Sequence, residues 1–168
     1  HTANRRQRQM CIRDSLDIDH FKHINDSLGH FCGDQLLTKL AERLQHVLDL
    51  SAHVARIGGD EFVIILPEID DNEHLITTIK DILTVFKKPF SLANHESLRV
   101  STSIGIALYP EDGRDSETLL KNADTAMYLA KKNGRNGYAF YSPELTDKSV
   151  SHVRLQSALH EAIEKDEL

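Results

Sequence analysis

Apolar residues recur at helical spacing in several stretches of the chain. Between about Asp34 and Leu48 they fall on one side of a helix, as they do in Asp71–Phe86 and again in Asp115–Asn133. Asp19 is placed to cap a further helix over His20–Leu28, and Gly29 is placed to end it. The sequence therefore predicts four helices, whose apolar stripes belong to the core.

Shorter β-rich runs lie between these helices. The runs Ala52–Ile57 and Glu61–Leu66 flank Gly58-Gly59-Asp60, which predicts a tight hairpin, and Pro67 is expected to close its second strand. Leu98–Leu108 reads as one long strand and Tyr138–Tyr141 as a short one.

The order of elements is strand, two helices, hairpin, helix, strand, helix, strand, so we expect an α+β fold with helices on a mostly antiparallel central sheet. A length of 168 residues fits one domain. No apolar run approaches the roughly 18 residues of a membrane span, and no signal pattern opens the sequence, so we expect a cytoplasmic protein.

Charge and cysteine content narrow the function. The formal net charge is −6, which argues against a nucleic-acid-coating protein in spite of Arg5, Arg6 and Arg8. Cys11 and Cys32 form no CxxC pair, so neither a disulfide framework nor a zinc site is indicated. The histidines His20, His23 and His30 could form a metal triad, but with 10 histidines in the chain, their clustering is weak evidence.

Carboxylates gather at two predicted strand ends. Asp17 and Asp19 close a strand and open a helix, while Asp60 and Glu61 lie at the hairpin tip. Each pair alone would be an ordinary solvated pair, but the set, next to a helix N-terminus and a Gly-Gly turn, favours a site for Mg²⁺ or Mn²⁺ with a nucleotide triphosphate. Backbone N–H groups around Phe21 and Lys22 would then bind phosphate oxygens, with the Lys22 charge beside them.

These residues resemble the GGDEF-domain diguanylate cyclases. The matching stretches follow the family pattern in order and spacing, over roughly residues 16 to 142. They are Asp17-Ile18-Asp19-His20-Phe21-Lys22-His23-Ile24-Asn25-Asp26, Gly29-His30, Gly33-Asp34, Arg56-Ile57-Gly58-Gly59-Asp60-Glu61-Phe62, Ser103-Ile104-Gly105, Ala123-Asp124, Ala126-Met127-Tyr128, Ala130-Lys131 and Gly134-Arg135-Asn136.

The resemblance implies an activity as well as a fold. It implies the ferredoxin-like palm of nucleotide cyclases, and the condensation of two GTP molecules to cyclic di-GMP with release of two pyrophosphates. Each 3′-hydroxyl must attack the other nucleotide's α-phosphate across an approximate two-fold axis, so a homodimer is expected.

Individual roles are implied in the same way. Asp17, the backbone carbonyl of Ile18, Asp60 and Glu61 would hold the metal ions. Glu61, together with Asp60, would serve in catalysis, as a metal ligand or a proton acceptor near the reacting hydroxyl.

The substrate's two ends also have implied partners. Asn25 and Asp34 resemble the pair that reads guanine, and a carboxylate does accept from guanine N1–H and the 2-amino group. Lys131 and Arg135 match residues that hold the terminal phosphates from the far helix.

Two departures from the family pattern qualify the resemblance. The Arg-x-x-Asp motif of product inhibition is replaced by Asp49-Leu50-Ser51-Ala52, so no inhibitory product site is expected. Met10–Ser15 reads as a poor central strand, since Arg13 and Asp14 stand where alternating apolar residues are wanted.

Residues 1–15 are accordingly interpreted as an N-terminal remnant. Met10–Ser15 also matches what the end sequence of a common sequencing-library transposon would encode in one frame. Our hypothesis is that this segment is an assembly artefact, and re-amplifying the source DNA with these codons intact would refute it.

The tail, residues 143–168, predicts an amphipathic linker helix. It resembles the helix that joins a GGDEF domain to a following EAL phosphodiesterase domain, so the parent protein is expected to be a longer GGDEF-EAL tandem, with any membrane anchor in other segments. Three functional readings follow: an active cyclase, a catalytically silent GTP-binding module that controls an attached EAL domain, or a fragment that folds poorly because of its first strand.

Overall fold

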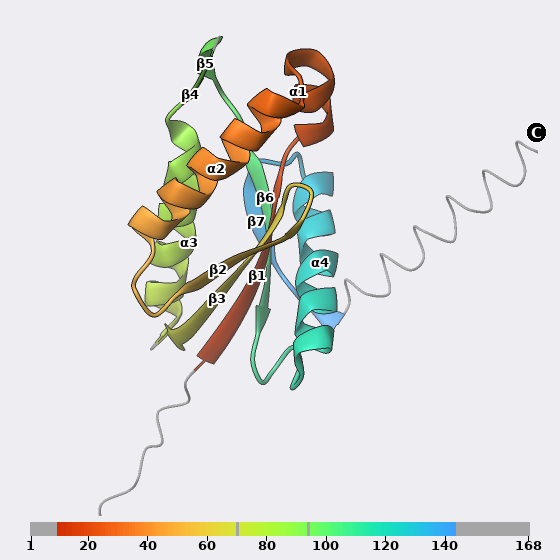
Figure 1. Cartoon of the computed structure of the whole chain (residues 1–168). Coiled ribbons are helices and arrows are strands. Elements are labelled where there is room, and N and C mark those ends of the chain that lie inside the picture. Colours follow the sequence, from red (N-terminus) through yellow and green to blue (C-terminus); the bar gives the residue numbers. More distant parts are fainter. Residues whose placement is uncertain (1–9, 70, 94, 144–168) are drawn as a thin grey trace, which may run out of the picture.

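A computed structural model describes residues 10–69, 71–93 and 95–143 (Figure 1). The predicted tail helix and residues 1–9 lie outside this range. In chain order the elements are β1 (Met10–Ile18), α1 (Phe21–Leu28), α2 (His30–Val47), β2 (His53–Gly58), β3 (Glu61–Ile69), α3 (Asn72–Lys87), β4 (Phe90–Leu92), β5 (His95–Leu98), β6 (Thr102–Leu108), α4 (Ser116–Lys132) and β7 (Gly137–Phe140).

The main sheet has five strands in the order β2-β3-β1-β6-β7. All neighbours are antiparallel except β6 and β7, and β1 lies at the centre, paired with β3 and β6. This confirms the predicted α+β palm with a mostly antiparallel sheet. Because β1 is central, its C-terminal end, where Asp17 lies, is flanked by strands on both sides.

Helices cover both faces of the sheet, α1, α2 and α3 on one face and α4 on the other (Figure 1). Successive side chains of β1 point to opposite faces of the sheet, so alternate residues contact the helices on opposite sides. Leu16 and Ile18 belong to the core formed with α1, α2 and α3. Ser15 and Asp17 point to the other face, where they contact Asp124 and Lys131 of α4. Ser15 and Asp17 are therefore presented to α4.

The helix ends largely follow the predictions. Asp71 and Asp115 each accept a hydrogen bond from a backbone N–H in the first turn of α3 and α4. Gly29, at φ +87°, ends α1 as expected. Local capping chemistry was sufficient to place these ends.

The predicted single strand over Leu98–Leu108 is wrong. Leu98 ends β5, which forms a small hairpin with β4, and only Thr102–Leu108 joins the main sheet as β6. Leu98 pairs with Phe90 of β4, whereas Thr102–Leu108 pairs with β1, so the apolar run is divided between two sheets.

The prediction that Pro67 closes its strand is also wrong, since β3 continues to Ile69. Pro67 lies beyond the last pair with β2, His53 with Ile65, and falls where the pairing with β1 is irregular. A proline, which has no N–H, is tolerated in a strand at such a position.

Met10–Ser15 forms the first part of β1, in spite of its poor strand sequence. The cost is visible at Asp14, whose side chain is fully buried and whose two carboxyl oxygens have no hydrogen-bond partner. Its neighbours across β3 and β6 are Ile64 and Ile106, both fully buried. Burial without a partner raises the pKa of Asp14 to about 8.

Gly105 allows α4 to approach β6 closely. A Cβ at this position would collide with the Ala123 carbonyl and with the backbone of Met127. Replacing Gly105 by Ala is therefore expected to lower the free energy of unfolding by about 1–3 kcal/mol, measured by urea denaturation. Gly58→Ala is the control, because no atom lies within 4 Å of the added methyl group. Equal loss in the two variants would contradict the close contact.

Candidate active site at the end of the central strand

Two carboxylates, one from a strand and one from a turn, meet at the end of β1. Asp17 is the residue before the last of this strand, and the β2–β3 turn places Asp60 close enough to raise the pKa of the Asp17 carboxyl. Burial is the largest cause of the increase, which the nearby Lys131 ammonium partly opposes, and the resulting pKa is about 6. The site therefore holds a partly buried, crowded acidic pair.

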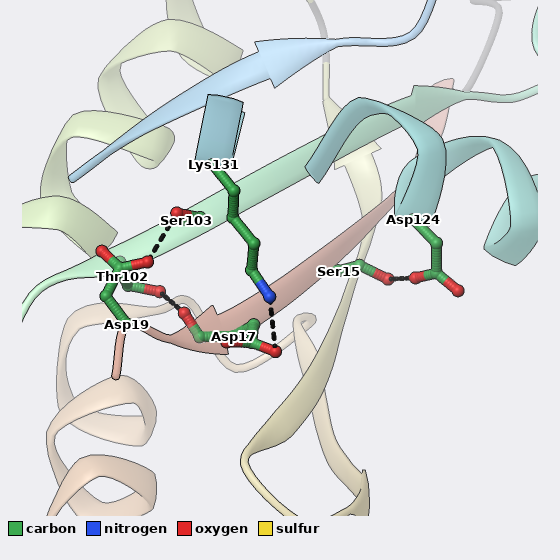
Figure 2. A network of polar contacts seen from close by, with 7 residues as sticks. All are labelled: Ser15, Asp17, Asp19, Thr102, Ser103, Asp124 and Lys131. Carbon is green, nitrogen blue, oxygen red and sulfur yellow. Dashed lines mark hydrogen bonds and ion pairs between the residues drawn. The ribbon is translucent and has the colours of Figure 1, made fainter. Parts of the chain in front are cut away.

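Lys131 supplies the positive charge for this pair. Its Nζ lies 3.0 Å from Asp17 Oδ2, with the side chains 29% and 12% exposed (Figure 2). The ammonium thus occupies a place beside the two carboxylates where a cation is stabilised. This arrangement suits a divalent ion, because an oxygen-only donor set with excess negative charge is what Mg²⁺ prefers.

The predicted metal ligands are only partly brought together. Asp17 and Asp60 are close, and Ile18, whose carbonyl was the third expected ligand, follows Asp17 directly. Glu61 pairs with Asp17 in the β1–β3 register, yet its side chain is exposed. Within the described ranges, no group of three or more His, Cys, Asp or Glu side chains could hold a metal ion, the histidine triad included.

Three consecutive hydroxyl residues, Ser101 just before β6 and the first two residues of that strand, hold the Asp17–Asp19 segment. Thr102 Oγ1 donates to the Asp17 carbonyl at 2.7 Å. Ser103 Oγ donates to Asp19 at 2.7 Å (Figure 2). Ser101 Oγ donates to the same carboxylate at 2.6 Å. Sequence reasoning singled out Ser103 alone; the available signal was the unbroken run of hydroxyl side chains in an otherwise apolar strand.

Asp19 does not cap α1, which corrects the prediction. It continues the alternation of β1 and its carboxylate turns toward β6, while His20 takes the N-cap position at φ +60° without a side-chain hydrogen bond. The N-terminus of α1, with Phe21 buried and Lys22 exposed, is therefore left without a side-chain cap. Uncapped N–H groups at a helix start are suited to phosphate oxygens.

The predicted base-reading residues lie on the two helices that follow. Asn25 belongs to α1, and its Oδ1 is buried with no hydrogen-bond partner. Gly33 of α2 makes this packing possible, because a Cβ there would collide with the Asn25 side chain. An unsatisfied buried amide oxygen is costly, which makes this atom a candidate acceptor for a ligand.

Asp34 lines a groove of about 570 Å³ between α2 and the β2–β3 hairpin. Leu37 and Phe62 supply part of its apolar wall, and Asp34 itself is exposed. A planar apolar ligand with hydrogen-bond donors on one edge fits this combination.

The predicted phosphate-binding pair lies at the end of α4. Lys131 is in its last turn, and Arg135 follows in a left-handed turn, exposed to solvent. The structure thus brings Asp17, Asp60 and Lys131 into one cluster, whereas Glu61 and Arg135 lie at its margin with exposed side chains.

Comparisons with known proteins show which family the chain belongs to. The family described as "Diguanylate cyclase, GGDEF domain" matches residues 1–137. The chain belongs to the GGDEF-domain family. This confirms the resemblance seen in the motifs, and it extends the match upstream of residue 16.

Relatives carry different activities in their names. The chain is 38% identical over 167 residues to the bifunctional diguanylate cyclase/cyclic di-GMP phosphodiesterase MucR of Pseudomonas aeruginosa, which covers 95% of this chain and 24% of MucR. It is 40% identical over 154 residues to the cyclic di-GMP phosphodiesterase NbdA of the same organism, covering 91% and 19%. The chain thus spans about a quarter or less of the length of these relatives.

A solved structure comprising only the GGDEF domain of TpbB from Pseudomonas aeruginosa has the same fold. It superposes with a TM-score of 0.79 at 35% identity, covering 86% of this chain and 83% of that one.

Among the helices in the described ranges, none combines the length and apolar character that crossing a membrane requires.

Proposed function

We propose that this GGDEF domain is a diguanylate cyclase that condenses two GTP molecules into cyclic di-GMP with release of two pyrophosphates. The observation that carries the proposal is the acidic pair Asp17 and Asp60 at the end of β1, next to the uncapped start of α1. Carboxylates for a metal and N–H groups for phosphate lie side by side, as nucleotidyl transfer needs. The substrate is a cytoplasmic nucleotide, so we place the domain in the cytoplasm.

Asp17, Asp60 and the Ile18 carbonyl would hold Mg²⁺ or Mn²⁺, which, when bound, neutralises phosphate charge and polarises the α-phosphate. Lys131 then turns from Asp17 to the terminal phosphates, and Arg135 binds them beside it. Phe21 and Lys22 supply backbone N–H groups to the phosphate chain. Glu61 would accept the proton of the attacking 3′-hydroxyl, and its exposed side chain supports this role because a second nucleotide can reach it.

A second copy of the domain completes the reaction. The proposed binding residues of one domain hold one GTP molecule. The hydroxyl that attacks its α-phosphate must come from a second GTP molecule. Two domains facing each other across a two-fold axis bring each hydroxyl to the other α-phosphate. A homodimer is therefore part of the proposed mechanism.

Asn25 and Asp34 are proposed to read guanine. The unpaired Asn25 Oδ1 and the Asp34 carboxylate are acceptors for the donors of the guanine edge, which adenine lacks in that arrangement.

Replacing Asp34 by Ala is expected to raise KM for GTP about ten- to a hundredfold and to reduce the preference for GTP over ATP, because guanine donors lose their acceptor. Asp81→Ala, which removes an exposed carboxylate on α3, is the control. Steady-state kinetics with both nucleotides measure the effect. Unchanged selectivity in the Asp34 variant would refute the assignment.

A second candidate is a catalytically silent GTP-binding module that controls an attached EAL domain. It is favoured by the similarity to NbdA, a relative named as a phosphodiesterase, and by the EAL-like tail sequence. Such a module would bind GTP through the same residues without forming product.

One assay separates the two candidates. The purified chain is incubated at high concentration with GTP and Mg²⁺ or Mn²⁺, and products are identified by mass spectrometry. Cyclic di-GMP that disappears in Glu61→Ala supports the cyclase. GTP binding without product, with equal GTP affinity in Glu61→Ala, supports the module.

A further inference from the structure

We propose that Asp19 is a positioning residue of the nucleotide site. Its carboxylate holds the turn that contains Arg135 in place beside the end of β1, where Asp17 lies. The inference rests on the proposed function, in which Arg135 binds the terminal phosphates. It assigns to Asp19 neither a metal-binding role nor a helix-capping role.

The contacts of Asp19 join two distant parts of the chain. Oδ1 accepts from Ser103 Oγ at 2.7 Å, and Oδ2 accepts from Ser101 Oγ at 2.6 Å and from the Asn136 backbone N–H at 3.1 Å. The Asp19 N–H in turn donates to the Ser101 carbonyl at 3.0 Å. Only 4% of Asp19 is exposed, and the donors to its carboxylate are Ser101 and Ser103, at and just before the start of β6, and the turn before β7. Figure 2 shows the contact with Ser103.

The turn that Asp19 holds is strained. Gly134, Arg135 and Asn136 have φ angles of +109°, +63° and +49°. Left-handed backbone is unfavourable for a residue with a side chain, more so for Arg than for Asn, so contacts outside these residues are needed to hold the turn. The hydrogen bond from the Asn136 N–H to Asp19 is a tertiary contact of this kind, and its acceptor is charged.

The consequence concerns the geometry of the site. Lys131 forms an ion pair with Asp17 directly. Arg135 is held indirectly, because the backbone N–H of the next residue, Asn136, donates a hydrogen bond to Asp19, which lies two residues after Asp17. Both cations are thereby held relative to one strand end, the same one that presents the carboxylates. Without Asp19 the turn keeps only its backbone hydrogen bonds to Ala130 and Lys131, so it leaves its left-handed conformation more often and carries Arg135 away from the phosphates.

The test compares binding of GTP with Mg²⁺ and binding of GMP, by calorimetry, in Asp19→Ala, Arg135→Ala, the double variant and the surface control Asp81→Ala. We expect Asp19→Ala to weaken GTP binding about tenfold. GMP, which lacks the terminal phosphates, should bind as before. Adding Asp19→Ala to Arg135→Ala should then have little further effect, because the first acts through the second. Additive losses, or equal losses for GMP and GTP, would overturn the proposal.

A second readout needs no nucleotide. Hydrogen exchange at the Asn136 amide, followed by NMR, should be about tenfold faster in Asp19→Ala than in the wild type and unchanged in Asp81→Ala. Unchanged exchange in Asp19→Ala would overturn the proposal. If the wild type binds no GTP, the proposed function fails, and the exchange rate alone decides whether Asp19 holds the turn.

Asp19→Asn covers the case in which Asp19→Ala does not fold. The asparagine keeps the shape of the side chain and one acceptor oxygen. A serine hydroxyl can switch from donating to accepting a hydrogen bond from the new amide NH₂ group, whereas the Asn136 N–H can only donate. We expect its exchange rate and GTP affinity to lie between those of the wild type and Asp19→Ala, with a cooperative melt. Values equal to those of the wild type would contradict a need for the carboxylate.

Discussion

Replacing Asp17 by Asn is expected to lower cyclic di-GMP formation on the order of a thousandfold while leaving the fold intact. The amide keeps the shape of the side chain but removes the negative charge that, together with Asp60, would bind the metal. Initial rates with GTP and Mg²⁺ measure the loss.

The same variant is expected to melt at an unchanged or higher temperature. The raised pKa of Asp17 shows that the folded protein disfavours its charged form, through burial and through Asp60. Removing the charge at neutral pH therefore removes an unfavourable contribution to the stability of the folded protein, although the ion pair with Lys131 is lost. A loss of activity that accompanies a lower melting temperature would instead indicate a structural role for Asp17, and Asp81→Asn serves as the charge-matched control.

The second large effect concerns stability. Replacing Asp14 by Val is expected to raise the free energy of unfolding at neutral pH by an amount on the order of 4 kcal/mol. A β-branched apolar side chain suits the central strand and fills the site between Ile64 and Ile106 without an unpaired polar group. A gain of this size is a large part of the 5–15 kcal/mol typical of domains.

This gain should depend on pH in a definite direction. The pKa of Asp14 rises from 3.8 to about 8 on folding, so between these values the folded chain holds a proton that the unfolded chain releases. Stability of the wild type therefore falls as pH rises through this window, by about 1.4 kcal/mol per pH unit from this group, and the penalty is complete above pH 8. The advantage of Asp14→Val should grow over the same window.

Asp14→Asn is the matched control for this prediction. It cannot ionise, so it should remove the pH dependence, yet it leaves a buried polar group and should be about 1–3 kcal/mol less stable than Asp14→Val. Urea denaturation from about pH 5 to about pH 8 measures all three proteins. Parallel stability curves for wild type and Asp14→Val would show that Asp14 is solvated or paired in solution.

Much of the fold could be predicted because local signals agree with the tertiary structure. Asp71 and Asp115 cap their helices, and the glycine pair before Asp60 makes the β2–β3 turn. The hairpin of β4 and β5 was missed because pairing partners, which are tertiary, decide where an apolar run is divided.

The site also combines residues that could be predicted from the sequence with contacts that only the tertiary structure shows. Asp17 and Asp60 are predicted from their positions at strand ends and Lys131 from the family resemblance, and the structure brings the three together. The role of Asp19 was misread, because Asp before a helix suits an N-cap, and only the packing of β1 against β6 shows that its partners are Ser101, Ser103 and Asn136. The sequence holds no local sign of a contact across 117 residues.

The central claim is that the domain joins two GTP molecules, and isotope mixing tests it most directly. The chain is incubated with Mg²⁺ and equal amounts of unlabelled and uniformly ¹³C-labelled GTP, and the cyclic dinucleotide is analysed by mass spectrometry. We predict light, mixed and heavy cyclic di-GMP in statistical proportion, with two pyrophosphates released per product. Folded protein that binds GTP but yields no mixed dinucleotide, or yields only GDP or GMP, would contradict the cyclase assignment.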